Sequence, residues 1–476
     1  MSGDIHLSIL HTNDLHGRVH QLSRIATLVH QVRQEVTAHD GYCLYVDAGD
    51  SEDNTLLESV LTRGSTMNAL LRAAGCDQVA LGNAIPIRYG PQAVENLAKH
   101  FGKPLLCANL FTREGDLIPG VTPSFILKIN DLTVAIVGFT APMNNFYTNF
   151  FGYPVQDPID LMPQLMEKAR DEGAKTILAL THISSRHDIE LAEKVAGIDV
   201  IIGGHDHKRI NPPMVVNNTL IVQSGEYGQM LGRLDLTIDS NSGKVIGHTA
   251  SMIPIDEAIP EDADVLAAVS VENHLIDEMM RQQIGEIREP LSVSDNKECT
   301  AGNLQADAVL EHVKGARIAM MVNGHWVSGL EAGTITQGQL YAANRSAGNP
   351  ALVNLTGAKI RQWLIAALNP ENISRQPHPL RGVRVGMPGI AGMSVVADRA
   401  HLEDLRVLID GIPLRDDEIY PVATTDLEIS EILGYLVIPD SEVQYEVPIV
   451  LPEIIEEYIK KHSPIKSVKM GRIVLG

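Results

Sequence analysis

The chain is short of basic residues. Its 476 residues include 38 Lys and Arg against 59 Asp and Glu, which gives a formal net charge of -21 at pH 7. A surplus of negative charge repels a polyanion unless a local basic patch or a bound metal reverses the field. We therefore expect no nucleic-acid polymer among the partners of this protein.

Cysteine and long apolar runs are scarce as well. The four cysteines, Cys43, Cys76, Cys107 and Cys299, form no C-x-x-C pair, which favours buried thiols in a reducing compartment. No stretch approaches the roughly 20 uninterrupted apolar residues that span a bilayer. The first residues also lack the pattern of a secretory signal, so we expect a cytoplasmic protein with no membrane partner.

The pattern of apolar residues predicts two α/β domains. With 44% hydrophobic residues the chain can bury large cores, and about 150 residues per domain suggests two or three domains. Over residues 1–255, short strand-like runs alternate with amphipathic helical stretches, as expected for βαβ units. Residues 256–290 resemble an acidic, proline-containing linker followed by a long helix. Residues 291–476 again mix strands and helices, which predicts a second α/β domain.

Five strand-like runs of the first domain end in residues that can bind metals. They end in D-x-H, G-D, G-N, T-H and G-G-H-x-H, and the candidate metal ligands are Asp14, His16, Asp50, Asn83, His182, His205 and His207. In open α/β sheets the functional crevice lies at the carboxyl ends of the strands. We therefore predict that these seven side chains meet at one metal site.

The number and type of ligands predict two divalent ions. Seven nitrogen and oxygen ligands exceed the needs of one ion but suit two ions ~3.5–4 Å apart that share a carboxylate. Thiolates are absent from the set, so Mn, Zn, Co or Fe is expected. Such a pair promotes displacement at phosphorus, and phosphoester hydrolysis is the default reaction. We assign Asn83 and His182 as catalytic residues as well as ligands.

The same motifs resemble a known family. "ILHTNDLHG", "DAGDS", "LGN", "LTH", "DVIIGGHDH" and, in the second half, "AGNLQADAVL", "GTITQGQLY" and "YPVATTD" are similar to the 5'-nucleotidase / UDP-sugar hydrolase / 2',3'-cyclic-nucleotide phosphodiesterase family. This family is a two-domain branch of the calcineurin-like metallophosphoesterases. The resemblance implies a first domain built as a four-layered α/β/β/α sandwich, joined by a linker helix to a second α/β domain that binds the nucleotide.

The resemblance also implies how the ligands divide. It places Asp14, His16 and His207 on the first ion, Asn83, His182 and His205 on the second, and Asp50 between them. Asp188 has two interpretations. It either orients a metal-bound histidine through the second ring nitrogen, as such ligands usually require, or is a solvated residue at the start of a helix.

One loop departs from the family. The family typically has Gly-Asn-His-Glu where this chain has Gly82, Asn83, Ala84 and Ile85. The resemblance implies that the histidine stabilises or protonates the leaving oxygen, and such acid catalysis contributes roughly 10²–10⁴-fold. Residues 85–87 have changed too, which favours natural divergence of the whole loop. We expect substrates with a good leaving group.

The second domain departs from the family at its substrate-binding motifs. An N-G-G-x-R segment appears here as "NGHWVSG", and a P-F-G-N loop appears as "RSAGN". The candidate substrate-binding residues are Asn323, His325, Trp326, Arg345 and Asn349. Trp326 could offer a stacking face and Arg345 an anion contact; a structural tryptophan and a surface arginine are the alternative interpretations.

Three functions fit these observations. The first is a two-metal phosphoester hydrolase that acts on a nucleotide or a related small phosphate ester. The alternative is a nucleotide or phosphate sensor, or a subunit of a larger complex, with a protein partner at the loop of residues 84–89. A third option is the same fold with different chemistry, such as hydrolysis of a sulfur compound, because fold alone does not fix function.

Overall fold

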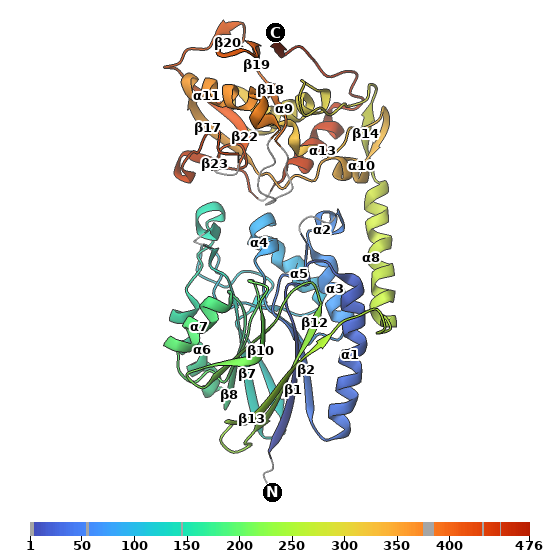
Figure 1. Cartoon of the computed structure of the whole chain (residues 1–476), viewed down its shortest axis with the longest axis vertical. Helices are drawn as coiled ribbons and strands as arrows, with labels where there is room; N and C mark the ends of the chain where they lie inside the picture. Colours follow the sequence, from blue (N-terminus) through green and yellow to red (C-terminus); the bar gives the residue numbers. More distant parts are fainter. Residues whose placement is uncertain (1–3, 54–56, 144–145, 375–384, 431–432, 448) are drawn as a thin grey trace. The chain divides into compact units, whose positions relative to one another are not determined.

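Two compact units make up the chain, Met1–Leu275 and Ile276–Gly476 (Figure 1). The computed structural model describes residues 4–53, 57–143, 146–374, 385–430, 433–447 and 449–476. The division falls inside helix α8 (Ala263–Arg281), within the stretch 256–290 that the sequence predicts as a linker helix. The predicted domain bounds themselves stay a prediction.

The first unit contains two mixed sheets. The five-stranded sheet has the order β13 (Val245–Pro254), β12 (Met230–Ile238), β1 (Ile5–Thr12), β2 (Tyr42–Asp47) and β3 (Gln78–Val79). The six-stranded sheet has the order β10 (Arg209–Val216), β11 (Thr219–Ser224), β9 (Val200–Ile202), β8 (Thr176–His182), β7 (Leu132–Thr140) and β6 (Ser124–Ile129). β1 and β2 are parallel, as are β7, β8 and β9.

Helices cover the outer faces of these sheets, and Figure 1 shows α1 and α3 on one side and α6 and α7 on the other. The helices of this unit are α1 (Val19–Ala38), α2 (Leu57–Thr62), α3 (Ser65–Ala73), α4 (Ala84–Tyr89), α5 (Val94–Phe101), α6 (Pro158–Asp171) and α7 (Ser185–Lys194). Short elements complete it: strands β4 (Leu105–Leu106) and β5 (Val121–Thr122), a 3-10 turn at Pro91–Ala93 and a π-helical turn at Tyr147–Phe151.

Apolar side chains of both sheets form one core between them, including Ile9 and Leu234 from the first sheet and Ile136 and Leu180 from the second. A further core joins the second sheet to α6 and α7. Strand β8 is buried along its whole length, as expected for a strand covered on both faces. The predicted four-layered α/β/β/α sandwich is confirmed.

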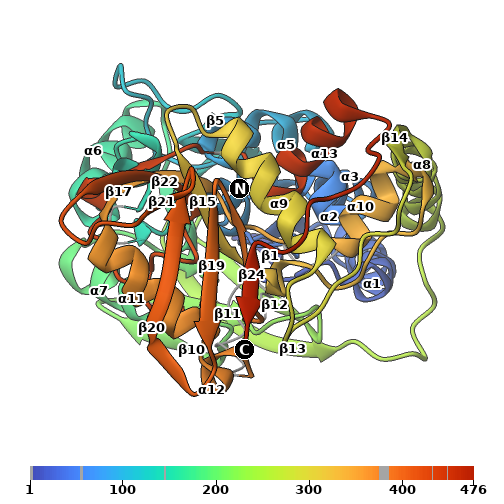
Figure 2. The same cartoon turned by 90° about the horizontal axis from the view of Figure 1, so that it is seen from above.

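The second unit is also an α/β fold. Its main sheet has the order β18 (Pro388–Ala391), β15 (Ile318–Val322), β22 (Ile419–Thr425), β17 (Pro350–Thr356) and β23 (Val443–Tyr445). A second sheet has the order β21 (Ile412–Pro413), β20 (His401–Ile409), β19 (Met393–Asp398) and β24 (Ile473–Leu475), of which Figure 2 shows the last three side by side. Strands β14 (Gln283–Ile287) and β16 (Gly333–Thr336) form a separate pair.

The helices of the second unit are α9 (Thr300–His312), α10 (Gln337–Ala343), α11 (Gly357–Leu368), α12 (Pro370–Ile373) and α13 (Leu451–His462), with 3-10 turns at Asn323–His325 and Asp440–Glu442. Trp363 of α11 lies fully buried in the core of this unit, next to apolar residues of β15, β17 and β22. Among the described residues, no helix combines the length and apolarity needed to cross a membrane.

Candidate metal centre

Loops at the carboxyl ends of the first unit's strands are tied together by backbone hydrogen bonds. In the loop after β1, the amide of Asp14 donates to the carbonyl of Gly49 (2.9 Å) and that of His16 to the carbonyl of Asp50 (3.2 Å). Both carbonyls belong to the loop after β2. Asp14, His16 and Asp50 have positive φ angles of 51°, 45° and 52°, which non-glycine residues rarely adopt. Such strain is typical of functional loops.

Asp14 lies at the centre of this arrangement. Its side chain is fully buried. One carboxylate oxygen, Oδ2, accepts hydrogen bonds from the side-chain amide of Asn13 (2.7 Å) and the backbone amide of His205 (2.9 Å). The other oxygen, Oδ1, has no hydrogen-bond donor among the described residues. The loops thus fix the carboxylate and leave one oxygen for a cation.

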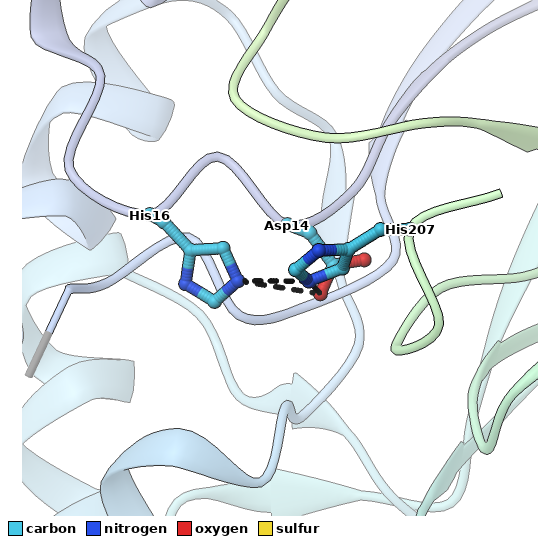
Figure 3. Close-up of side chains that lie close together, drawn as sticks. All are labelled: Asp14, His16 and His207. Carbon is cyan, nitrogen blue, oxygen red and sulfur yellow. Dashed lines mark hydrogen bonds and ion pairs between the residues drawn. The ribbon is translucent and has the colours of Figure 1, made fainter. Parts of the chain in front are cut away.

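Asp14, His16 and His207 form the first group of candidate ligands, and Figure 3 shows both imidazole rings turned toward the Asp14 carboxylate. Asp14 Oδ1 lies 3.6 Å from His16 Nε2 and 3.3 Å from His207 Nε2. His16 Nδ1 donates to the carbonyl oxygen of Glu52 (2.9 Å), which can only accept. The proton therefore sits on Nδ1, and Nε2 offers its lone pair to an ion.

Asp50, His182 and His205 form the second group. His182 Nε2 lies 3.2 Å from Asp50 Oδ2, and its Nδ1 donates to the carbonyl of Ala48 (2.7 Å). The two groups are adjacent, because the same nitrogen is also 3.9 Å from Asp14 Oδ1 of the first group. The structure brings six of the seven predicted ligands into two neighbouring clusters that follow the predicted division.

The seventh predicted ligand, Asn83, occupies the N-cap position of α4, and its side chain makes no capping hydrogen bond. Its neighbour Gly82 packs against Asp50: a Cβ atom at Gly82 would stand 2.1 Å from Asp50 Oδ1. The backbone amide of Ala84 donates to the same Oδ1 (2.9 Å). The loop after β3 therefore adjoins the second group.

The donor atoms of this centre fit a pair of metal ions. Asp14 Oδ1 and Asn83 Oδ1 are buried, and within the described part of the chain neither has a hydrogen-bond partner. Buried polar atoms are normally paired, because each unpaired one costs about 1–3 kcal/mol. Cations held by these atoms would remove that cost. The carboxylate, amide and imidazole donors suit divalent Mn, Zn, Co or Fe.

The electrostatics of the centre also favour cations. Although burial opposes ionisation of Asp14, the neighbouring His182, His16 and His207 hold the pKa of its carboxyl well below the usual range. Burial likewise opposes the charged form of His182, but the Asp50 and Asp14 carboxylates raise the pKa of this imidazole to about 9. A proton on His182 thus takes the place that a metal ion would fill, and metal binding must release it.

The altered loop is helical and largely buried. In α4, Ile85, Pro86, Arg88 and Tyr89 are buried, whereas Ala84 and Ile87 are half-buried. The half-buried methyl group of Ala84 can neither donate nor accept a proton. Because most of α4 is buried, this loop offers little surface to a protein partner. A partner at residues 84–89 stays a prediction.

Asp188 takes neither of the roles that the sequence suggested. It is fully buried in the first turn of α7, which is incompatible with a solvated helix start. Its Oδ1 accepts from the hydroxyl of Thr181 (2.6 Å), whereas the second ring nitrogen of His182 is held by the Ala48 carbonyl. Burial, with Asp206 as a further cause, raises the pKa of Asp188 to about 7.

The candidate substrate residues of the second unit are mostly engaged inside that unit. His325 bonds Ser346 Oγ through Nδ1 (2.7 Å) and Glu428 Oε1 through Nε2 (2.8 Å), and all three are buried. The Trp326 ring is fully buried. This placement gives Trp326 a packing role in place of the exposed stacking face that the sequence allowed.

The other three candidates differ in exposure. Asn323 is buried and its side-chain amide donates to the Ser294 carbonyl (3.3 Å). Asn349 is also buried and donates to the carbonyl of Ile449 (2.7 Å). Arg345 is exposed, so its guanidinium remains accessible to an anion. Contact of any of these residues with substrate stays a prediction.

Two supporting residues were not identified from the sequence. Asn13 holds the Asp14 carboxylate, and its Oδ1 accepts from the amide and hydroxyl of Ser224. Glu226 Oε2 lies 2.5 Å from Nδ1 of His207 and fixes that ring. Asn13 belongs to "ILHTNDLHG", a motif that carries the family resemblance, and Glu226 lies in "QSGEYG", just after β11. The sequence signal that could have identified them is the position of their polar side chains close to predicted ligands.

Comparison with known proteins agrees with this geometry. Residues 7–209 match the calcineurin-like phosphoesterase family, and residues 283–435 match the 5'-nucleotidase C-terminal domain family. The metallophosphoesterase YunD of Bacillus subtilis, described as uncharacterized, is 26% identical over 457 residues, covering 94% of this chain and 98% of its own. The 5'-nucleotidase of Bos taurus is 26% identical over 534 residues, covering 98% and 90%.

A solved structure shares the fold. The NAD nucleotidase of Haemophilus influenzae superposes with a TM-score of 0.62 and 17% sequence identity, and the alignment covers 99% of both chains. The first match, residues 7–209, lies in the first unit and includes both groups of candidate ligands. The second match, residues 283–435, lies in the second unit. The chain therefore joins a calcineurin-like metallophosphoesterase domain to a 5'-nucleotidase C-terminal domain and is a metal-dependent phosphoester hydrolase.

Proposed function

We propose that the chain uses two divalent ions to hydrolyse a nucleotide or a related small phosphate ester with a good leaving group. One observation carries the proposal. Two adjacent ligand groups, Asp14 with His16 and His207 and Asp50 with His182 and His205, surround buried donor atoms that lack hydrogen-bond partners in the described part of the chain. The 5'-nucleotidase relatives support a nucleotide as substrate.

The ions, when bound, would supply the positive charge that binds a phosphoryl oxygen and makes a water molecule acidic. The chain's own residues do the rest. The Asp14 and Asp50 carboxylates balance the cationic charge, and the fixed Nδ1–H bonds of His16 and His182 keep both Nε2 atoms directed at the centre. Because these groups are preorganised by the loops, little reorganisation is needed as charge develops.

The leaving oxygen receives no proton from position 84, since alanine stands there. We therefore propose a substrate whose leaving group is stable as an anion or is protonated by solvent or by the substrate itself. Pyrophosphate bonds, cyclic phosphates and aryl phosphates meet this requirement. Manganese, zinc, cobalt and iron are the proposed ions, because the ligand set contains imidazole nitrogens, carboxylates and an amide.

A substrate screen tests this proposal. The Mn²⁺-loaded full chain is assayed with p-nitrophenyl phosphate, bis-p-nitrophenyl phosphate and a panel of mono-, di-, cyclic and sugar nucleotides. We expect hydrolysis of at least one ester, lost in His182→Asn and retained in the control His100→Asn, whose ring Nδ1 bonds the Asn96 carbonyl of the same helix (2.9 Å). Absence of any turnover with a fully metal-loaded chain would contradict the proposal.

A further inference from the structure

A cavity of about 590 Å³ opens beside the second ligand group, within the first unit. The end of β7, the N-terminus of α6, the start of α7 and the loop that carries His205 form its walls. His205 belongs both to this lining and to the cluster with Asp50 and His182. A molecule in the cavity therefore lies next to the proposed phosphoryl site. Its volume is in the range of sites for small organic ligands.

The walls of this cavity combine apolar and polar side chains. Met143 and Ile159 are half-buried, and Ile183 is buried. The two carboxylates of the lining are engaged by the protein itself: Asp157 accepts from the amide of Ile159 (2.9 Å), and Asp206 accepts from the hydroxyl of Ser185 (2.6 Å). The cavity therefore suits an organic group with an apolar face rather than a second metal ion.

His187 adds one directional polar group to the lining. It is exposed on the first turn of α7. Its Nδ1 donates to the carbonyl of Ile183, four residues earlier, at 2.8 Å and also lies 3.0 Å from Ser184 Oγ. A carbonyl oxygen only accepts, so the ring proton resides on Nδ1. In the neutral ring, Nε2 is then an acceptor for a hydroxyl group of a ligand.

We propose that this cavity receives the organic leaving group of the substrate, a ring-sized moiety with one apolar face and a hydroxyl group for His187 Nε2. The inference rests on the proposed function, because it assumes that the phosphoryl group lies at the two ligand groups. His187 is then a specificity-determining residue: it selects hydroxyl-bearing ring esters, such as aryl phosphates, over esters with small leaving groups.

Three substrates with leaving groups that need no acid separate these features. Acetyl phosphate has a small leaving group, phenyl phosphate a ring, and 3-hydroxyphenyl phosphate a ring with a hydroxyl donor. Ile159→Trp places a larger ring in the cavity, and we expect it to lower the kcat/KM ratio of phenyl to acetyl phosphate about tenfold, as loss of apolar contacts of this size implies. A ratio that stays within about twofold of the wild-type value would overturn the cavity assignment.

The histidine is tested by the ratio of 3-hydroxyphenyl to phenyl phosphate. His187→Ala should lower this ratio about fivefold, in line with the loss of one hydrogen bond, and His187→Gln, which keeps an acceptor, should regain most of it. His39 is the matched control, since its Nδ1 also bonds the carbonyl four residues earlier (Glu35, 2.8 Å) on an exposed helix end. An equal ratio in His187→Ala and His39→Ala would contradict the role of His187.

A binding measurement keeps this inference separate from the proposed function. Saturation-transfer NMR of resorcinol with the metal-free full chain reports on the cavity without turnover. We expect a signal with the wild type and His39→Ala that Ile159→Trp removes. If no ester is hydrolysed but this pattern holds, the proposed function fails and the cavity stands. If esters are hydrolysed but resorcinol gives the same signal with Ile159→Trp, the cavity assignment fails alone.

Discussion

Individual atoms of the centre have separate tasks. The two oxygens of Asp14 illustrate this, because Oδ2 is occupied by two donors of the protein and Oδ1 is left without one. His182 divides its ring in the same way, with Nδ1 on the Ala48 carbonyl and Nε2 toward Asp50. At Ala84 the backbone and the side chain also differ: the amide donates a hydrogen bond to Asp50, whereas the methyl group has no proton to donate.

Restoring the histidine at position 84 should change leaving-group dependence. We expect Ala84→His to raise kcat/KM for an alkyl phosphate at least about tenfold, because an acid beside the leaving oxygen contributes up to roughly 10²–10⁴-fold. An aryl phosphate should gain less than about threefold, as its leaving group needs little acid. Steady-state kinetics on both esters, with Ala84→Gln as control, measure this. An equal gain on both esters would contradict the assigned loss.

Asp188 should make stability depend on pH. Burial raises its pKa from 3.8 to about 7, so the folded chain holds a proton that the unfolded chain releases. The associated stability is complete below pH 3.8 and is lost as the pH rises to about 7. Relative to wild type, Asp188→Asn should gain roughly 3–5 kcal/mol in free energy of unfolding between pH 4 and pH 7.5. Denaturant unfolding of both metal-free proteins at both pH values measures this gain. If the free energy of unfolding changed equally with pH in the wild type and the variant, Asp188 would not be buried in its neutral form.

At the scale of elements, strand ends determine where the ligands meet. The meeting of the candidate ligands could be predicted from the sequence because each follows an apolar run, and the carboxyl ends of parallel strands such as β7, β8 and β9 share one edge of a sheet. The residues that hold these side chains in place could not be predicted. Glu226 and Asn13 meet His207 and Ser224 only once separate loops fold together.

The second unit shows the same limit. Its α/β class follows from the alternation of strand-like and helical patterns. The bond between His325 and Glu428 joins residues that are 103 positions apart in the sequence, and Trp326 is fully buried. No local pattern distinguishes these residues from ones that contact substrate, because histidine and tryptophan serve both purposes.

The close packing of Gly82, in the loop after β3, against Asp50 should control metal binding. A Cβ at Gly82 would stand 2.1 Å from Asp50 Oδ1 and 2.3 Å from the Asp50 amide nitrogen, so this loop or Asp50 must move in Gly82→Ala. We expect the affinity for Mn²⁺ to fall about 10–100-fold, as for other residues that position metal ligands. Isothermal titration calorimetry measures this.

Gly247→Ala serves as the control for that prediction. The added Cβ would make an ordinary contact with Thr237 at 3.6 Å, so its Mn²⁺ affinity should match the wild type. Unchanged affinity in Gly82→Ala would show that the loop after β3 does not support the second ligand group.

On the scale of the whole molecule, the two units have different relations to the metal. Both ligand clusters lie in the unit Met1–Leu275, so metal removal should loosen that unit selectively. In hydrogen-exchange mass spectrometry, Mn²⁺ should slow exchange at residues 13–17 and 203–207, because an ion that binds the folded loops opposes their opening. Exchange in α9 (Thr300–His312) of the second unit should not change. Equal protection in both units would contradict a metal centre confined to the first.

Metal-dependent turnover tests the central claim most directly, namely that two ions at these loops carry out phosphoester hydrolysis. The metal-free full chain is titrated with Mn²⁺ while bound metal is counted by elemental analysis and hydrolysis of p-nitrophenyl phosphate is followed. We predict about two ions per chain, no activity without metal, and loss of both metal and activity in Asp14→Asn. Activity that persists after complete metal removal, or a chain with two ions bound that hydrolyses no phosphate ester, would contradict this account.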